Sequence, residues 1–566
     1  MRKATLEDLV LGDVLRARGR THRAEAFLKF RDGELSYGEV DAMADRVARG
    51  LIACGVRRGE HVAVMLPNGP EIIYVVFALA RLGAVAVPVN TAHRGELLRH
   101  VLASSDSTML IVDAAYVGRL APLARRLPGL RRVVVHSGAG GNDAGEADGL
   151  PALPGEPALP WRELLDHGAE PVQADVAFHD LLAIMYTSGT TGPSKGAMCS
   201  HALALTCAHD SLNYLDRWGK TIYCPLPLFH AAGLWDGMMS ALLSGGAIAI
   251  IDKFHASTFW DDVRRFDAAV ALSVFSMIPI LLGAEPGPRD RDHPLEMFYM
   301  GKSSLDAPLR ERFGVRSVET YTSTEAGIAT GSPYGEWLPG SCGTANDERF
   351  EVAVVDSHDR EVGNGEPGEL VLRPRQPFVL TTGYYGAAEA TVECFRNMWF
   401  HTGDRVWRDD DGYFYFLDRM KDSIRRRGEN ISAFDLEYQV NLHPAVLECA
   451  AIGVPSELEE EEVKVAVVRK PDSQLGHEEL IEYCQENLPR HMVPRYLEFV
   501  DELPRTPTEK VAKYRLRAEG NRGITEGTWD REAAARQAAS KPEVAKPREA
   551  PEPSGAAGGE SVAVDG

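Results

Sequence analysis

Residues 186–198 form a run of glycine, hydroxyl and lysine side chains that reads YTSGTTGPSKGAM. The apolar segment 181–185 precedes this run and has the length of a buried strand. Gly189 and Gly192 allow the backbone to turn its N–H groups toward one cavity, and the hydroxyls and the Lys195 ammonium group add donors around it. The run does not fit the GxxxxGK[ST] spacing of the Walker phosphate loop. It therefore predicts a polyphosphate-binding loop of another kind.

Further motifs follow this loop in order along the chain. They are Pro227–His230, Tyr321–Glu325, Phe400–Asp404, Asp418–Asp422 and Pro504–Lys510. Together with the loop, they resemble the motifs of the adenylate-forming (ANL) superfamily, which contains acyl- and aryl-CoA synthetases, peptide-synthetase adenylation domains and beetle luciferases. The resemblance runs from about residue 20 to about residue 517. Within the superfamily, the segment Arg427–Ser432 is most similar to the carnitine/crotonobetaine-type CoA ligases.

The composition limits the kind of partner. A formal net charge of −21 disfavours nucleic acid, whose phosphate backbone requires a basic surface. The eight cysteines include no CxxC pair, so we expect a reducing compartment and no structural zinc. The first residues, MRKATLED, lack the apolar core of a signal peptide, and no long apolar segment follows. We therefore expect a cytoplasmic protein with no membrane span that acts on small molecules as a monomer or homodimer.

The pattern of apolar segments predicts an α/β fold with more than one domain. Helical and strand-like segments alternate over residues 36–89, which favours a parallel sheet. Short strands with turn residues between Arg349 and Arg373 indicate a small β subdomain. The resemblance implies a large N-terminal domain, 1–418, with parallel sheets in αβαβα layers, and a small mobile α+β C-terminal domain, 419–519. Residues 520–566, rich in Ala, Glu, Pro and Gly, are expected to form a disordered tail.

The resemblance also implies a reaction in two halves. A carboxylate attacks the α-phosphorus of ATP to give an acyl-adenylate and pyrophosphate, and the thiol of CoA then displaces AMP. Such a transfer depends on positioning and on the neutralisation of charge. The loop residues expected to wrap the β- and γ-phosphates are Thr187, Ser188, Gly189, Thr190, Thr191, Gly192 and Lys195.

The later motifs supply the remaining implied roles. Thr324 touches the α-phosphate, and Glu325 holds Mg²⁺, a hard cation that prefers oxygen ligands. Tyr321 stacks on adenine, while Asp404, assisted by Arg419, accepts hydrogen bonds from the ribose hydroxyls. The catalytic set that the resemblance implies is Lys510, Thr324, Glu325 and His230.

Two positions are implied to serve the change between the half-reactions. Lys421 lies where the family places a hinge, about which the small domain rotates between an adenylating and a thioester-forming pose. In the first pose Lys510 bridges the α-phosphate and the attacking oxygen. In the second pose Gly428 lines the tunnel for the pantetheine arm of CoA. A structural glycine at a turn is the alternative interpretation of Gly428.

The chain departs from the family pattern near the acyl pocket. Residues 301–304 read GKSS where a GGAP-like segment is usual, and Thr322 replaces a glycine. We expect Lys302, Ser303 and Thr322 to line the substrate pocket together with His230. The added bulk, and a buried lysine that requires an anionic partner, disfavour long-chain fatty acids and favour a small or polar acid, aromatic acids included. Lysine is rarely buried completely, so a Lys302 that points to solvent is an equal alternative.

Two functions are compatible with these motifs. The first is an AMP-forming acid–CoA ligase, which the segment Arg427–Ser432 favours. The second is an ATP-dependent diazotase, which adenylates nitrite and passes the nitroso group to an aromatic amine. A lysine in a small pocket suits so small an anion. The presence of Lys510, Glu325 and Asp404 argues against a catalytically dead scaffold.

Overall fold

The computed structural model divides the chain into two compact units. The first unit contains Met1–Ser423, Ser432–Asp435 and Pro504–Leu516, and the second contains Ile424–Ile431, Leu436–Leu503 and Arg517–Gly566. The described residues are 5–93, 95–138, 157–187, 194–274, 277–333, 335–419, 423–426, 429–456, 461–488, 490, 492–506 and 510–540. The segment Pro504–Leu516, which carries Lys510, belongs to the first unit. The predicted domain boundaries at residues 418 and 519 stay a prediction.

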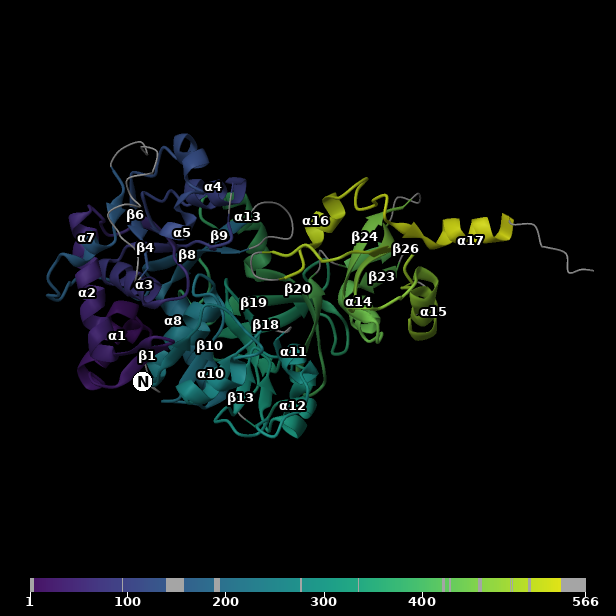
Figure 1. Ribbon diagram of the computed structural model, residues 1–566, viewed down its shortest axis with the longest axis horizontal. Coiled ribbons are helices and arrows are strands. Elements are labelled where there is room, and N and C mark those ends of the chain that lie inside the picture. The colour runs from purple at the N-terminus through teal and green to yellow at the C-terminus, as the bar shows by residue number, and fades with distance from the viewer. Residues whose placement is uncertain are drawn as a thin grey trace, which may run out of the picture. The chain divides into compact units, whose positions relative to one another are not determined.

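The first unit is built on two seven-stranded sheets (Figure 1). The strands of one sheet, in spatial order, are β14 (Arg316–Val318), β13 (Met297–Tyr299), β12 (Ala268–Leu272), β10 (Thr221–Cys224), β11 (Ile248–Ile250), β1 (Ala26–Phe30) and β2 (Gly33–Ser36). Those of the other are β7 (Leu159–Pro160), β6 (Arg132–His136), β5 (Met109–Asp113), β3 (His61–Met65), β4 (Val85–Pro88), β8 (Leu181–Thr187) and β9 (Lys195–Ser200). The edge pairs β1–β2 and β8–β9 are antiparallel, and the inner pairs are parallel. The predicted α/β class with parallel sheets is confirmed.

The alternation of side chains along these strands produces the layers. In β3, Val62 faces a core shared by both sheets and Ala63 faces a second core. In β12, Val270 faces the shared core and Ala271 a third one. The helices that fill the shared core include α1 (Leu11–Thr21), α2 (Tyr37–Ala53), α3 (Pro70–Leu82), α8 (His201–Leu215) and η3 (Ala232–Met239). The outer cores are closed by α4 (Gly95–Ser104) and η2 (Ala121–Arg126) on one side, and by α10 (Phe259–Phe266) and α12 (Asp306–Arg312) on the other. This order is the predicted αβαβα arrangement.

Local sequence signals set the ends of these helices. Ser36 caps α2, because its hydroxyl accepts a hydrogen bond from the N–H of Glu39 while the Glu39 carboxylate accepts one from the N–H of Ser36 at 2.8 Å. Helix α3 begins at Pro70, whose fixed φ suits the first turn, and ends at Gly83 with a φ of 63°. The elements predicted between residues 36 and 89 are therefore present.

Smaller antiparallel sheets complete the first unit. One contains β18 (Phe350–Val355), β19 (Gly368–Pro374), β20 (Phe400–Arg408) and β21 (Phe414–Arg419), and another contains β15 (Tyr321–Ser323), β16 (Gly327–Gly331) and β17 (Thr344–Ala345). Strands β18 and β19 confirm the predicted β subdomain. Short helices occur at η1 (Leu6–Asp8), α5 (Ala114–Val117), α7 (Arg162–Leu165), α9 (Ser240–Ser244), α11 (Met277–Gly283), η4 (Ser303–Leu305), α13 (Ala388–Cys394) and η5 (Arg396–Met398).

The second unit holds a four-stranded sheet with helices, as the predicted α+β arrangement requires. Its strands are β24 (Val446–Pro455), β25 (Glu461–Arg469), β26 (Tyr496–Phe499) and β27 (Trp529–Asp530). Helix α15 (His477–Asn487) buries Leu480, Ile481 and Cys484. Helix α17 (Arg531–Ser540) also belongs to this unit, whereas β22 (Ser423–Arg426), β23 (Glu429–Ser432), α14 (Ala433–Asn441) and α16 (Lys513–Ala518) have residues in both units. No described helix combines the length and the apolar content that a bilayer crossing demands.

The prediction of disorder from residue 520 is wrong for residues 520–540. Strand β27 pairs with β26, and Trp529 stacks on His477 with ring centroids 5.2 Å apart. The hydroxyl of Thr525 donates a hydrogen bond to Glu498 Oε1 at 2.6 Å. A few specific contacts order this segment, and a composition argument, which looks for an apolar stripe, does not detect them.

Lys464 ties the same segment to the sheet. Its side chain is fully buried, forms an ion pair with Glu498 and donates a hydrogen bond to the carbonyl of Gly523 at 2.6 Å. Burial raises the pKa of Glu498, but hydrogen bonds from Lys464 and Thr525 outweigh this effect, and the pKa lies below its usual value. The Glu498 carboxylate is therefore ionised at neutral pH.

Replacing Glu498 with alanine should destabilise the second unit by about 3 kcal/mol, because it leaves a buried ammonium group without its partner. This value is at the lower end of the usual cost, since the Glu498 side chain keeps 12% of its exposure. Urea unfolding, followed by hydrogen exchange of amides in β24–β26, measures the change. Glu526→Ala, at an exposed position of the same segment, is the matched control. A loss below about 1 kcal/mol would show that the ion pair does not tie the segment.

Candidate active site

The two ends of the predicted phosphate loop lie opposite each other in a hairpin. Strands β8 and β9 pair antiparallel, and Thr187 is the register partner of Lys195. The predicted loop residues Ser188, Gly189, Thr190, Thr191 and Gly192 lie outside the described residues, as do Lys421 and Gly428. Thr187 and Lys195, which flank the loop in sequence, lie at the carboxyl end of β8, the side on which α/β sheets bind ligands.

Glu325 lies beside the first residue of this loop. Its Oε1 accepts hydrogen bonds from the hydroxyl of Thr187 at 3.3 Å and from the hydroxyl of Tyr384 at 3.1 Å. The Nζ atom of Lys195 lies 5.5 Å from the centre of the Tyr384 ring, within cation–π range. The structure thus brings Thr187, Lys195 and Glu325 together, and Thr324 directly precedes Glu325 in a half-buried turn.

Sequence reasoning missed Tyr384. Residues 381–385 run antiparallel to β9, with Ala197 paired to Tyr384, and the N–H of Thr381 donates to the carbonyl of Glu325 at 2.6 Å. This backbone path carries the tyrosine to the carboxylate. The sequence TTGYYG shows aromatic residues between glycines, but it contains nothing that names Glu325 as their partner.

A second contact joins the residues predicted for adenine and ribose. Tyr321, on β15, donates its hydroxyl hydrogen to Asp404 Oδ2 at 2.6 Å, and both side chains are buried. Asp404, on β20, is the register partner of Arg419 on β21. The Phe416 ring stacks on Tyr321 with centroids 6.5 Å apart. The predicted nucleoside residues are therefore neighbours on the small sheets of the first unit.

His230 lies just before η3 and is half-buried. Its Nδ1 accepts a hydrogen bond from the N–H of Ala232 at 3.2 Å, so the neutral ring carries its proton on Nε2. Asn68 fixes the preceding loop, since it donates to the carbonyl of Leu226 at 3.0 Å and accepts from the N–H of Leu228 at 2.8 Å. Sequence reasoning also missed Asn68, which lies 160 residues before Leu228.

Burial lowers the pKa of His230 to about 4, and the positive charge of Lys510 acts in the same direction. Lys510 is exposed, and its carbonyl accepts a hydrogen bond from the N–H of Thr506 at 2.7 Å. The positive charge of Lys510, the predicted catalytic lysine, therefore influences the pKa of His230, the predicted pocket histidine. His230 is neutral at pH 7 and can act there as a hydrogen-bonding group without adding charge.

Replacing Lys510 with alanine should raise the pKa of His230, because loss of a nearby positive charge favours the protonated ring. Burial is unchanged, so the pKa should stay below the ordinary value of 6.5. Histidine-selective ¹³C NMR titration measures the shift, with His230→Gln to assign the signal. Lys513→Ala removes a lysine of the same segment and should leave the titration where it is. An unmoved His230 signal in Lys510→Ala would place the ammonium group too far away.

Ser303 is hydrogen-bonded to Glu319, and the Glu319 carboxylate also acts electrostatically on Lys302. Ser303 donates both its N–H and its hydroxyl to Glu319 Oε2, each at 2.8 Å. Burial lowers the pKa of Lys302, and the Glu319 carboxylate acts against that change. Lys302 follows β13 and Glu319 follows the parallel neighbour β14, so both lie at one edge of the sheet. The anionic partner that we expected Lys302 to require is thus available within the chain.

Thr322 lies against a different group. Its hydroxyl hydrogen-bonds the thiol of Cys207 on α8, and that thiol lies 3.7 Å from Asp236 Oδ1. Asp236 also accepts a hydrogen bond from Ser211 at 2.6 Å, and burial raises the pKa of Asp236 to about 6. Thr322 is therefore part of a buried polar cluster between α8 and η3, whereas Lys302 and Ser303 share a separate carboxylate.

The residues at the loop fit a magnesium ion held chiefly by a nucleotide. Among the described residues, no group of three His, Cys, Asp or Glu side chains could hold a metal. Mg²⁺ is usually bound by one or two carboxylates together with substrate phosphates. Glu325, with the Thr187 hydroxyl beside it, offers oxygen donors of this kind. The donor set therefore matches the predicted metal.

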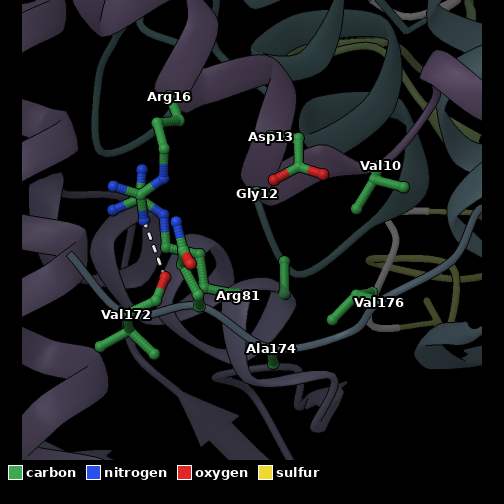
Figure 2. A pocket seen from close by; sticks show the side chains of 10 residues that line it. Val10, Gly12, Asp13, Arg16, Arg81, Val172, Ala174 and Val176 are labelled. Carbon is green, nitrogen blue, oxygen red and sulfur yellow. Dashed lines mark hydrogen bonds between the residues drawn. The ribbon is translucent and has the colours of Figure 1, made fainter.

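A cavity of about 200 Å³ lies elsewhere in the first unit and includes none of the predicted site residues (Figure 2). Its guanidinium groups, from Arg16 and Arg81, both contact the carboxylate of Asp45 at 2.9 Å. Arg16 also donates to the carbonyl of Val172 at 3.0 Å, the dashed line in Figure 2. Arg81 also forms an ion pair with Asp41, so two carboxylates compensate the two guanidinium charges, and the cavity does not present the uncompensated positive charge that a second phosphate site would need.

Comparison with known proteins identifies the family. Residues 15–385 match the AMP-binding enzyme family, and residues 435–510 match the AMP-binding enzyme C-terminal domain. The crotonobetaine/carnitine–CoA ligase of Salmonella arizonae is 30% identical over 504 residues, which cover 85% of this chain and 93% of the ligase. The ligase of the same name from Salmonella paratyphi B is 29% identical over 496 residues, which cover 86% and 93%.

Solved structures share the fold over at least 90% of the chain. ATP-bound MatB from Rhodopseudomonas palustris has a TM-score of 0.78 and 26% identity, with 90% of this chain and 98% of that chain covered. The anthranilate CoA ligase AuaEII in complex with anthranoyl-AMP has a TM-score of 0.80 and 24% identity, with 95% and 99% covered, a likeness of fold alone. The chain therefore belongs to the AMP-binding enzyme family, as an AMP-forming acid–CoA ligase or a related adenylate-forming enzyme.

Proposed function

We propose that this enzyme activates a carboxylic acid with ATP, releases pyrophosphate and transfers the acyl group from AMP to CoA. The observation that carries the proposal is the contact of Glu325 with Thr187 and Tyr384 at the phosphate loop, with Lys195 over the tyrosine ring. A carboxylate for a metal and an ammonium group for phosphates are what a bound Mg·ATP needs. The curated relatives named above are called CoA ligases, which supports CoA as the acceptor.

The residues of the chain act in this proposal through position and charge. Bound Mg²⁺ would supply neutralisation of the phosphate oxygens. Lys195 holds the β- and γ-phosphates, and Asp404 accepts hydrogen bonds from the ribose. Lys510 keeps the carboxylate oxygen of the acid close to the α-phosphate, where negative charge develops. His230, uncharged at pH 7, orients the acid without competing for that charge.

The second half-reaction requires a change of pose. We propose that the chain rotates about Lys421 and that Gly428 leaves room for the pantetheine arm, since a side chain there would obstruct the thiol. Both positions carry over from the family motif. The division into the domains 1–418 and 419–519, and a monomeric or homodimeric state, belong to the same proposal.

For the acid we propose a small or polar molecule, aromatic acids included. Lys302 and Thr322 add bulk and polarity at positions where the family usually has small residues. The Glu319 carboxylate favours the charged form of Lys302 against the effect of burial, so the chain itself supplies an anionic group and the pocket does not demand an inorganic anion. This compensation removes the reason for preferring nitrite, and the diazotase alternative is not proposed.

One assay tests the activity. Purified protein is given ATP, Mg²⁺ and a panel of carboxylic acids or nitrite, with and without CoA or an aryl amine, and pyrophosphate is measured. We expect release with at least one small or polar acid and acyl-CoA formation when CoA is present. Release that depends on nitrite, with product formed only when an aryl amine is present, would contradict the proposal.

The variant Lys302→Ala with Thr322→Gly tests the substrate class. It removes a charge and restores the volume usual in the family, so larger and more apolar acids should begin to be adenylated. A change of this size is worth about 1–3 kcal/mol of discrimination, and the switch should be partial. The ratio of kcat/KM for a short polar and a longer apolar acid measures it, with Ser304→Ala, at an exposed neighbouring position, as control. An unchanged ratio would place both residues outside the pocket.

A further inference from the structure

We propose that Tyr384 is a positioning residue that sets the orientation of Glu325 and holds Lys195 at the phosphate loop before the nucleotide arrives. The inference rests on the proposed function, because it takes Glu325 as the metal ligand and Lys195 as the phosphate ligand. It assigns a role to a residue that lies between these two groups and outside the motifs of the sequence.

The first step concerns the carboxylate. The hydroxyls of Tyr384 and Thr187 reach the same atom, Glu325 Oε1, from two elements, at 3.1 and 3.3 Å. Two donors on one oxygen restrict rotation of the carboxylate about its terminal bond. Partners of this kind orient the ligand groups of metals and are commonly needed for full metal affinity.

The second step concerns the charge on the other side of the ring. The Lys195 ammonium group lies 5.5 Å from the centre of the Tyr384 ring, where the negative face of the ring attracts it. The same positive charge draws electron density from the ring and makes the phenol a better donor to Glu325. Tyr384 thus engages both Lys195 and Glu325, and each charged group remains close to the loop where Mg·ATP would bind.

The third step concerns the rigidity of the tyrosine itself. Its N–H donates to Thr391 Oγ1 at 2.9 Å, which ties it to α13, and its backbone pairs with Ala197 of β9. Gly383 has a φ of +123°, and a Cβ at this position would lie 2.4 Å from the Thr391 side chain. The backbone that presents Tyr384 is therefore fixed from both sides.

Tyr384→Phe keeps the ring under Lys195 and removes the hydroxyl that donates to Glu325. The matched control is Tyr385→Phe, because the adjacent hydroxyl donates instead to exposed Asp106, at 3.0 Å. The readout is Mn²⁺ binding, followed by electron paramagnetic resonance, in the presence of α,β-methylene-ATP, a nucleotide that cannot transfer its adenylyl group. We expect Tyr384→Phe to weaken Mn²⁺ binding about 10- to 100-fold and Tyr385→Phe to bind as the wild type does.

Two further variants separate the parts of the inference. Thr187→Val removes the other donor to Oε1, so it should also weaken Mn²⁺ binding, and it tests the inference if Tyr384→Phe does not fold. Tyr384→Leu also removes the ring, and it should weaken binding of the nucleotide analogue without metal, whereas Tyr384→Phe should not.

The outcomes distinguish the inference from the proposed function. Wild-type Mn²⁺ affinity in Tyr384→Phe, or an equal loss in Tyr385→Phe, would overturn the positioning role. A wild-type protein that binds Mn²⁺ with the analogue but releases no pyrophosphate with any acid would contradict only the proposed function. A wild-type protein that binds neither the analogue nor Mn²⁺ would overturn both.

Discussion

The substitution Lys510→Ala should lower the rate of pyrophosphate release by about a thousandfold while leaving ATP binding largely intact. The lysine has the place in its motif at which the family brings a cation to the developing negative charge. Its charge already reaches His230, whose pKa burial and Lys510 together lower to about 4. Loss of a donor that acts mainly in the transition state lowers kcat much more than it weakens nucleotide binding.

Single-turnover pyrophosphate release and equilibrium binding of α,β-methylene-ATP are the two measurements for this variant. Lys513→Ala controls for the loss of a positive charge from the same segment. Adenylation at the wild-type rate in Lys510→Ala would refute the assignment. A parallel loss of analogue binding would instead assign Lys510 to nucleotide binding in the ground state.

The substitution Glu325→Gln should reduce the rate of adenylation by a similar factor, for a different reason. The amide keeps an oxygen that can accept from Thr187 and Tyr384, but it removes the negative charge that a divalent cation requires. A bound metal contributes several kcal/mol of charge stabilisation in such reactions, and about 4 kcal/mol corresponds to about a thousandfold in rate.

The loss in Glu325→Gln should shrink as the magnesium concentration rises, because mass action compensates for weaker binding. Rates measured across a series of Mg²⁺ concentrations test this. Glu393→Gln, an acid-to-amide change at an exposed position of α13, should follow the wild-type curve. A rate deficit that is the same at every Mg²⁺ concentration would mean that Glu325 acts other than through the metal.

The sequence was most informative where the signal is local. Apolar alternation located the strands, and the Ser36–Glu39 capping box marked the beginning of α2, because both depend on residues close together in the chain. The motif order identified Glu325, Asp404 and Lys510 as a set. The structure then placed Tyr321 against Asp404, which supports their proposed roles.

Contacts between segments far apart in the chain could not be predicted from the sequence. Tyr384 is 59 residues from Glu325, and the two meet only because residues 381–385 pair with β9. Lys302 and Glu319 are separated by two helices, η4 and α12, and by strand β14, and the parallel pairing of β13 with β14 brings them to one edge. Neither contact has a periodic signature, so the pattern of residues could suggest a lysine in need of a partner without identifying the partner.

The ordered segment after residue 520 matters for attempts to exchange modules between related enzymes. The match to the AMP-binding C-terminal domain ends at residue 510, and a graft cut there would separate Lys464 and Glu498 from Gly523 and Thr525. The recipient enzyme would then contain the buried ammonium group of Lys464 without the residues after 510 that surround it in this protein. A transferable module of this protein therefore extends through β27 to the first turns of α17, about thirty residues farther than family boundaries suggest.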